Sequence, residues 1–414
     1  MRLTCRDEND ISIKGRGLVL ACWCLPAVIV GLATLAARAQ YPTPRLYTLE
    51  PPGGKLGSTV EVIIGGADLD DATALEFYHP GLKAERIPDP PPPKPDPKDK
   101  KPKPPPTPPT KFKVTIAGNV APGIYDARVI GKWGVSNPRA FVVGDLAEVM
   151  ETEPNDDVDK AQKLEINQVV NGTINKNVDV DYFLFTGKKG QRVLAHCAAS
   201  SIDSRATPFL QIIAADGRRL AGNWRFDDRD AFVDVTLPSD GDYLIRVNEH
   251  AYLFGGNEYF YRLTLSQKPW IDMAYPPVVQ PGKANTITLF GRNLPGGQPD
   301  PAARVGRRVL DKASVQVTPP NDTGSLTFQG TELPSSGSLD GYHYRIKGPA
   351  GISNPVLLAY ATAPIVLDNE ANDERAKAQE IAIPCELCGR VEKRRDVDWY
   401  SFAAKKDEVL VIEG

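Results

Sequence analysis

The sequence predicts an all-β protein built from tandem β-sandwiches that follow an N-terminal signal segment. Short runs alternate apolar and polar residues, as in residues 57–69 (GSTVEVIIGGADL), and glycine-rich turns close them. The 414 residues include 38 prolines and 35 glycines but only 3 methionines, which is typical of a chain with many turns. A long internal repeat is the third observation, and it indicates duplicated domains, each with its own core.

The repeat places the same residues 217 positions apart without a gap. Glu153, Asn155, Asp156, Ala161, Gln162, Gly172, Asp179 and Asp181 recur as Glu370, Asn372, Asp373, Ala378, Gln379, Gly389, Asp396 and Asp398. Gly134, Ser136, Asn137 and Pro138 recur as Gly351, Ser353, Asn354 and Pro355. Enzymes rarely need one domain twice in series, whereas binding modules gain avidity from it. The repeat therefore favours binding over catalysis.

Residues 41–146 and 269–364 are predicted to be two sandwiches of immunoglobulin type. The strand and turn of residues 57–69 recur at residues 282–294, at an offset of 225. Residues 111–116 and 124–130 read as further strands, and Gly-x-Ser-Asn-Pro ends each region with turn residues.

A proline- and lysine-rich run at residues 87–110 explains the change of offset from 225 to 217. It cannot bury a core, and its prolines favour extended polyproline II. We interpret it as a solvated insertion between two strands; a spacer or a ligand of a proline-binding domain are the alternatives.

Residues 147–268 are predicted to form a sandwich of a second type. Its expected strands cover residues 181–185, 191–195, 208–213, 231–237, 242–247 and 259–265. The second copy, residues 365–414, stops at the position equivalent to Cys197, so one sheet face would be uncovered. We expect the native product to continue and residues beyond Ala363 to be poorly folded alone.

The first 39 residues read as an export signal. Lys14 and Arg16 precede an apolar run over residues 17–37, and Ala37-Arg38-Ala39 predicts cleavage before Gln40. An uncleaved anchor is the alternative, and it would be the chain's one attachment to a membrane. Both interpretations predict a secreted, periplasmic or cell-surface protein.

Three of the 6 cysteines, Cys5, Cys22 and Cys24, lie in this leader. Cys385 and Cys388 form Cys-x-x-Cys with no second pair nearby, so a local disulfide is expected rather than zinc. With Cys197 the only other cysteine, the chain is not a disulfide-stapled scaffold.

Residues 151–265 closely resemble the bacterial pre-peptidase C-terminal domain, a β-sandwich appended to secreted proteases. The resemblance rests on Glu151-Thr152-Glu153-Pro154-Asn155-Asp156, Ala161-Gln162, Gly172-x-Ile174, Asp179-x-Asp181-Tyr182-Phe183 and Gly241-x-Tyr243. Residues 368–414 are similar in truncated form, with Ala371 in place of Pro154. Residues from Tyr41 and from Trp270 more weakly resemble immunoglobulin-like modules of the plexin and transcription-factor (IPT/TIG) type.

Acidic residues of this repeat are candidate calcium ligands, because oxygen donors at this density suit a hard cation. They are Glu151, Glu153, Asn155, Asp156, Asp179 and Asp181, repeated as Asp368, Glu370, Asn372, Asp373, Asp396 and Asp398. The resemblance to collagenase-borne members implies the same use of an acidic linker. The alternative is that they cap turns and pair with Lys160 or Lys176 in solvent. Asp227, Asp228 and Asp230 are expected to form a solvated turn, with a second cation site as the weaker alternative.

Aromatic residues gather late in this domain and could bind collagen-like or glycan ligands. They are Trp224, Tyr252, Phe254, Tyr259, Phe260 and Tyr261. The alternation along residues 259–261 predicts that one face is core and the other is exposed.

Catalysis by these 414 residues is not expected. The 4 histidines stand outside any His-Glu-x-x-His, no Gly-x-Ser-x-Gly is present, and Ser136 and Ser353 lie in turns. The net charge of -3 gives no field for nucleic acid. The sequence therefore predicts an exported binding and spacer protein that engages extracellular protein or polysaccharide. The alternative is the non-catalytic front part of a larger secreted peptidase or other hydrolase.

Overall fold

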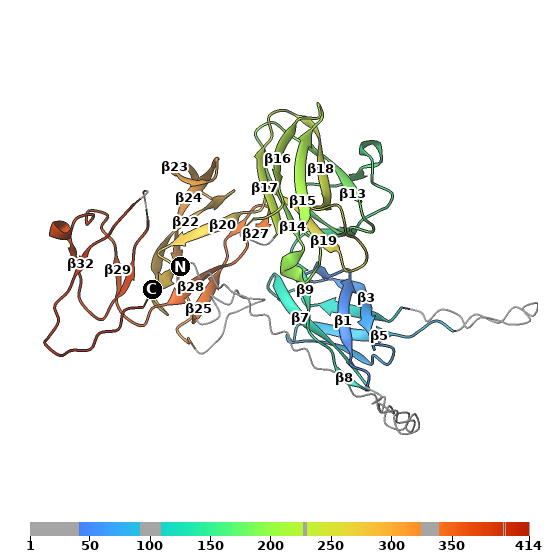
Figure 1. The fold of residues 1–414 in the computed structure, drawn as a ribbon, viewed down its shortest axis with the longest axis horizontal. Helices are drawn as coiled ribbons and strands as arrows, with labels where there is room; N and C mark the ends of the chain where they lie inside the picture. The colour runs from blue at the N-terminus through green and yellow to red at the C-terminus, as the bar shows by residue number, and fades with distance from the viewer. Residues whose placement is uncertain are drawn as a thin grey trace, which may run out of the picture. The chain divides into compact units, whose positions relative to one another are not determined.

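The computed structural model describes residues 41–91, 109–226, 230–323, 339–391, 393 and 395–413, and those from Thr43 onward belong to one compact unit. The predicted leader, most of the proline-rich run, Asp227 and Asp228 lie outside the described residues. In the part of the chain that the structure describes, the fold is all β with three short 3-10 helices (Figure 1). Within the described residues, no helix is long and apolar enough to cross a membrane.

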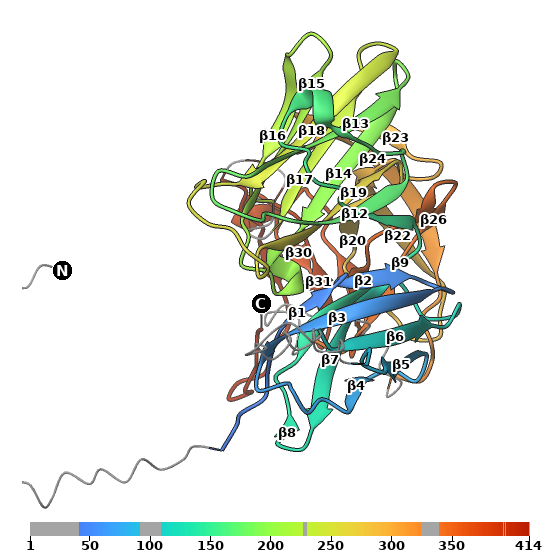
Figure 2. The ribbon, with the colours of Figure 1, turned by 90° about the vertical axis from the view of Figure 1, so that its right-hand side faces the viewer.

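The first sandwich packs the sheet β1-β3-β6-β5 on the sheet β2-β9-β7-β4 (Figure 2). Its strands are β1 (Arg45–Glu50), β2 (Gly53–Lys55), β3 (Thr59–Ala67), β4 (Ala74–Phe77), β5 (Leu82–Ile87), β6 (Lys111–Ile116), β7 (Gly123–Gly131), β8 (Gly134–Val135) and β9 (Arg139–Gly144). Alternate residues such as Val62, Phe112 and Phe141 meet in one core. The expected strands at residues 57–69, 111–116 and 124–130 correspond to β3, β6 and β7.

The second sandwich has two five-stranded sheets, β10-β12-β19-β14-β17 and β11-β13-β18-β15-β16. Its elements are β10 (Ala147–Met150), η1 (Val158–Lys160), β11 (Gln162–Lys163), β12 (Gln168–Thr173), β13 (Val180–Gly187), β14 (Arg192–Ala198), η2 (Ser200–Ile202), β15 (Pro208–Ala214), β16 (Arg219–Asn223), β17 (Ala231–Thr236), β18 (Gly241–Glu249) and β19 (Phe260–Ser266). All six expected strands are confirmed. The linker strand β10 pairs in parallel with β12, so it belongs to this sandwich.

The third sandwich repeats the first. Its strands are β20 (Trp270–Tyr275), β21 (Val278–Val279), β22 (Asn285–Arg292), β23 (Gln298–Val305), β24 (Arg308–Val317), β25 (Gly341–Tyr344), β26 (Lys347–Gly348), β27 (Gly351–Ile352) and β28 (Val356–Tyr360). The offset changes at two places rather than one. Residues 88–110 separate β5 from β6, whereas the equivalent strands β23 and β24 are separated by residues 306–307. Residues 318–340, between β24 and β25, are the second stretch at which the two copies differ in length.

The asparagine side chain of each Gly-x-Ser-Asn-Pro turn makes the two hydrogen bonds that the backbone of a neighbouring strand would make. Asn137 accepts a hydrogen bond from the Leu46 N–H (3.0 Å) and donates one to its C=O (2.9 Å). Asn354 does the same with Ile271 at 2.8 Å each. Both partners lie beside a bulge in β1 or β20, which are edge strands of their sheets, so the amide satisfies backbone groups on an edge that no other strand pairs. Ser136 and Ser353 are buried and bonded to backbone, as structural residues.

The last described segment reproduces the beginning of the second sandwich. Its elements are β29 (Ile365–Leu367), η3 (Arg375–Lys377), β30 (Gln379–Glu380), β31 (Glu386–Cys388) and β32 (Tyr400–Ser401). β29 pairs in parallel with β31, and β30 with β32, as β10 pairs with β12 and β11 with β13. Most side chains after Tyr400 are exposed.

The expected disulfide is wrong, because Cys385 and Cys388 are both free. Cys388 is buried at the end of β31, and Cys385 precedes that strand. Three residues of extended chain span about 10 Å, beyond the separation of about 7 Å that a disulfide tolerates.

Contacts between the second sandwich and its neighbours are of two kinds. Phe260 packs with Ala140 and Ile202 in a small apolar cluster against the first sandwich. Asp234 receives hydrogen bonds from Arg192 (2.6 Å) and from Arg292 of the third sandwich (2.9 Å). Asp234 and Arg292 are buried, so these charges satisfy one another in a shared interface.

Candidate cation site

The acidic linker is held in place by one side chain. After β10 the chain turns through residues 151–156 and reaches β11 through η1. Gln162 accepts a hydrogen bond from the Thr152 N–H at 2.7 Å and donates one to the Met150 C=O at 3.0 Å. Gln379 makes the same pair with Asn369 and Leu367, both at 2.9 Å. This clamp explains why a glutamine occupies the repeated position.

Three of the predicted ligands come together in the second sandwich. Carboxylate oxygens of Glu151, Glu153 and Asp181 lie within 4.8 Å of one another. Glu151 and Glu153 come from the linker, and Asp181 comes from β13, where it points inward and is fully buried. The linker and the sandwich therefore both contribute charge to one site.

Hydrogen bonds orient the two glutamates. The Glu151 carboxylate accepts from Asn155 Nδ2 at 3.0 Å and from the Thr173 N–H at 2.9 Å. The Glu153 carboxylate accepts from Asn175 Nδ2 at 2.6 Å and from the Asn155 N–H at 3.1 Å. Asn155 thus uses its donors to position both acids, which leaves its Oδ1 for another partner.

Tyr261 is a member of the site that the sequence did not predict. Its hydroxyl lies 2.7 Å from Glu151 Oε1 and 2.8 Å from Asp181 Oδ2. A hydroxyl carries one proton, so it can donate to only one of these carboxylates at a time. A side chain at Gly172 would meet the Tyr261 ring at 2.5 Å, which accounts for glycine at that repeated position.

Because the site is buried, its carboxyl groups are unfavourable in the ionised form. Burial and the neighbouring Glu151 charge raise the pKa of Asp181 to about 9. Burial also raises the pKa of Glu151 and of Asp179, and it raises that of Tyr261 well above its usual value. Carboxyl groups in this setting retain a proton or gain a cation.

Two buried oxygens of the site have no hydrogen-bond donor among the described residues, Asn155 Oδ1 and Asp181 Oδ1. Buried polar atoms are nearly always satisfied, so such atoms indicate a missing partner. The donor set of carboxylate and amide oxygens suits calcium or magnesium rather than zinc. The residues therefore fit a hard divalent cation.

The other two predicted residues of this copy lie at the edge. Asp179 is buried, accepts from the Asn175 N–H at 2.6 Å, and has Lys176 Nζ 3.4 Å away. Asp156 pairs with the same exposed lysine at 3.4 Å. The solvent-pairing alternative thus describes Asp156, whereas Asp179 shapes the turn before β13.

The second copy gathers a different triad, Asp373, Asp396 and Asp398. Lys393 lies 2.6 Å from Asp373 and 3.5 Å from Asp396, so this cluster already has a cation beside it. Glu370 instead faces Arg390 at 3.8 Å. Asp368 and Asn372 are buried nearby. The predicted residues of this copy thus divide between two surroundings.

Asp230 is not the solvated turn residue that the sequence predicted. It is buried and accepts hydrogen bonds from Ser201 Oγ, from the Ala199 N–H (3.0 Å) and from the Ser201 N–H (3.2 Å). Burial acts to raise its pKa, but His196 and these donors lower it to about 2. The Ser201 hydroxyl donates to Asp230 rather than to His196, so the three residues do not form a catalytic triad.

The predicted exposed face of residues 259–261 is also wrong. Tyr259, Phe260 and Tyr261 are all buried, because the first sandwich covers the face on which Phe260 lies. Phe254 stays 51% exposed and stacks on Tyr259 with centroids 6.1 Å apart, and Trp224 stacks on His250 at 4.3 Å. The surface aromatic set is therefore smaller than expected.

Comparison with known proteins adds one sequence relative and several fold neighbours. No family model matches the chain. A segment of 107 residues is 33% identical to a probable subtilase-type serine protease of Deinococcus radiodurans, covering 25% of this chain and 15% of that protein.

The similar solved structures have low identity and low TM-scores. They include the pre-peptidase C-terminal domain of a Bacillus anthracis collagenase, at TM-score 0.22 and 11% identity, covering 28% of this chain and 99% of that one. The secreted serine protease VesC of Vibrio cholerae has TM-score 0.17 and 10% identity, with coverages of 52% and 48%. The glucan-complexed SGBP-B of Bacteroides ovatus has TM-score 0.17 and 10% identity, with coverages of 48% and 74%.

Proposed function

We propose that this chain is an exported, non-catalytic binding and spacer protein whose second sandwich is ordered by calcium. The observation that carries the proposal is the buried site of Glu151, Glu153 and Asp181, with two oxygens that have no donor among the described residues. Calcium is the preferred ion because all the donors are oxygens and the sequence predicts export.

A cation at this site would join the linker to the sandwich. Glu151 and Glu153 precede η1, whereas Asp181 belongs to β13 and Tyr261 to β19. Binding to all three segments would fix the path by which the chain enters the sandwich. A spacer needs such fixed junctions if its domains are to present a ligand surface at a constant distance. The partner we propose is an extracellular protein or polysaccharide, bound with avidity by repeated modules.

Calorimetry and thermal unfolding of the full chain test the cation. The chain stripped with EDTA should release or absorb heat on titration with CaCl₂, and its unfolding midpoint should rise. Asp181→Asn should remove both effects. Asp242→Asn is the matched control, since the exposed Asp242 lies in β18 and its side chain accepts one hydrogen bond from the described residues, from the Thr186 hydroxyl at 2.6 Å. Absence of calcium heat and of any midpoint shift in the unmodified chain would refute the calcium site.

The curated match favours a second candidate, the non-catalytic part of a larger secreted peptidase. A 33% identical segment occurs in a probable subtilase-type serine protease. An antibody raised against this chain, used on culture medium of the source cells, would isolate the native product. Labelling of that product by a fluorophosphonate would support the peptidase, and an unlabelled product made of further β repeats would support the spacer.

A further inference from the structure

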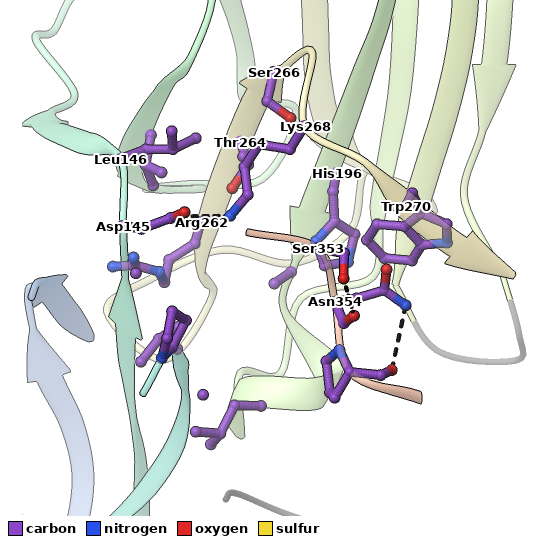
Figure 3. A pocket seen from close by; sticks show the side chains of 18 of the residues that line it. Asp145, Leu146, His196, Arg262, Thr264, Ser266, Lys268, Trp270, Ser353 and Asn354 are labelled. Carbon is purple, nitrogen blue, oxygen red and sulfur yellow. Dashed lines mark hydrogen bonds and ion pairs between the residues drawn. The ribbon is translucent and has the colours of Figure 1, made fainter. Parts of the chain in front are cut away.

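A cavity of about 310 Å³ lies where strands of the three sandwiches meet, apart from the cation site (Figure 3). This volume is at the lower end of the range for small-molecule sites. Its floor is the outer face of the sheet β10-β12-β19-β14-β17. The first sandwich supplies one side through residues 142–146, and the third supplies another through residues 353–355.

The floor is chemically distinct from the core beneath it. Along β19, Tyr261, Leu263 and Leu265 point into the core. The alternate residues Arg262, Thr264 and Ser266 line the cavity instead. Neither hydroxyl makes a hydrogen bond to another described residue. The sheet therefore offers two hydroxyl groups to whatever occupies the space.

The walls are mainly apolar and aromatic. Trp270 lies 4.5 Å from Phe232 and 5.4 Å from His196 between ring centroids, and Figure 3 shows the indole beside the imidazole. Ile124 and Leu194 also line the space. Such walls favour an apolar ligand body over a sugar, whose hydroxyl groups would need many more polar partners.

Most of the basic side chains around the cavity already face a carboxylate. Arg262 contacts Glu148 at 2.7 Å, Lys268 contacts Asp145, and His196 lies 3.6 Å from Asp230. Arg345 donates a hydrogen bond to the Ser353 C=O at 3.2 Å, and the charge of Asp145, which already pairs with Lys268, also acts on it. Arg345 is half-buried, and burial lowers its pKa. Two basic side chains, Arg345 and Lys268, thus share the one Asp145 carboxylate beside an apolar space.

We propose that this cavity binds the free C-terminus of a peptide that ends in a large apolar residue. The carboxylate pairs with Arg345, the hydroxyl groups of Thr264 and Ser266 bond the last peptide unit, and the side chain packs against Trp270 and Phe232. This inference does not depend on calcium, because no member of the cation site lines the cavity.

Titration calorimetry of the full chain with two probes tests the assignment. Acetyl-Gly-Gly-Phe carries a free carboxylate, and its C-terminal amide differs only there. The acid should bind about tenfold or more tightly than the amide, because a hydrogen bond to a charged group contributes about 1.5–3 kcal/mol. Arg345→Gln should weaken the acid to the level of the amide and leave the amide unchanged.

Arg304→Gln is the matched control, since Arg304 also donates to a backbone carbonyl, that of Pro301, but is exposed and outside the cavity. Thr264→Phe should fill the space and abolish binding of both probes. Equal affinity for acid and amide in the unmodified chain, tighter binding of glucuronate than of the peptide, or no binding of either peptide would overturn the proposal. The comparison of acid and amide decides even if Arg345→Gln fails to fold.

Discussion

The two acidic repeats share a turn but not an environment. In both copies a glutamine clamps the linker, a 3-10 helix follows, and a lysine lies near two aspartates. In the first copy the ligand cluster is Glu151, Glu153 and Asp181, with Asp181 fully buried. In the second the cluster is Asp373, Asp396 and Asp398, of which Asp373 is exposed and Asp398 is half-buried, whereas the Asp396 side chain is 3% exposed.

The difference comes from a strand that is distant in sequence. Tyr261 lies in β19, 80 residues after Asp181, and its ring and hydroxyl cover Glu151 and Asp181. The described residues of the second copy contain the turn and four short strands but no equivalent of β19. The turn is thus a local property of the repeated sequence, and it buries Asp368 and Asn372 without a strand equivalent to β19. The cover that Tyr261 gives to Asp181 requires the complete sandwich.

The largest expected effect is a difference in calcium affinity between matched variants. Asp181→Asn should weaken the tightest calcium site of the full chain by about 100-fold or more, because it removes a buried charged ligand. Asp398→Asn should change that tightest site by less than about threefold, since Asp398 belongs to the other cluster, where Lys393 already faces two of the carboxylates. Calcium titration by calorimetry measures both. Equal losses would show that the two copies are equivalent sites.

A smaller effect is expected from pH. The pKa of Asp181 is about 9 in the folded chain against 3.8 ordinarily, so between these values the folded state binds more protons than the unfolded state. In EDTA the contribution of this group is therefore fully present below about pH 4 and is lost as pH rises towards 9. Calcium replaces the proton, so the calcium-induced rise in unfolding midpoint should be greater at pH 8 than at pH 5.

Thermal scans in EDTA and in CaCl₂ at the two pH values measure this difference, and Asp181→Asn should abolish it. A calcium effect that shrinks as pH rises would contradict the assignment. Other titrating groups contribute equally in EDTA and in CaCl₂, so their contributions cancel when one midpoint is subtracted from the other. Asp230 is such a group: its pKa is lowered to about 2, so its contribution to stability is lost only in strong acid.

The smallest effect concerns the clamps. Gln162→Ala removes two hydrogen bonds and should lower the free energy of unfolding of the second sandwich by about 1–3 kcal/mol. Gln379→Ala removes the equivalent pair, but it should act only locally because few side chains after it are buried. Hydrogen exchange at the Thr152 and Asn369 amides measures the local effect of each substitution. Equal losses of global stability in the two variants would contradict the expected difference between the two copies.

The sequence predicted the strands because alternation is a local signal. Residues 57–69, 111–116 and 181–185 all fall on observed strands. It also predicted Glu151, Glu153 and Asp181 as neighbours, since the repeat marked them as a set. What it missed depends on contacts between distant segments. Nothing near Tyr261 indicates that its hydroxyl meets two acids, and nothing near Phe260 indicates that another sandwich covers it.

The cavity was missed for the same reason. The alternation Arg262, Thr264 and Ser266 correctly marks a face that is not core, and in an isolated sandwich such a face would be solvated. It becomes a floor because two other sandwiches stand over it. Likewise, Asp230 is predicted to be solvated by its acidic neighbours in sequence, whereas Ser201 and His196 enclose it.

The parallel pairing of β10 with β12 has a mechanical consequence. A pull on the chain through β9 reaches the second sandwich along β10, in the direction of the strand itself. The bonds between residues 147–150 and 168–171 then resist sliding together, instead of opening one at a time as a zipper would. A strand loaded in this way resists pulling with few hydrogen bonds. An ion bound beside Met150 would hold the end of β10 in place.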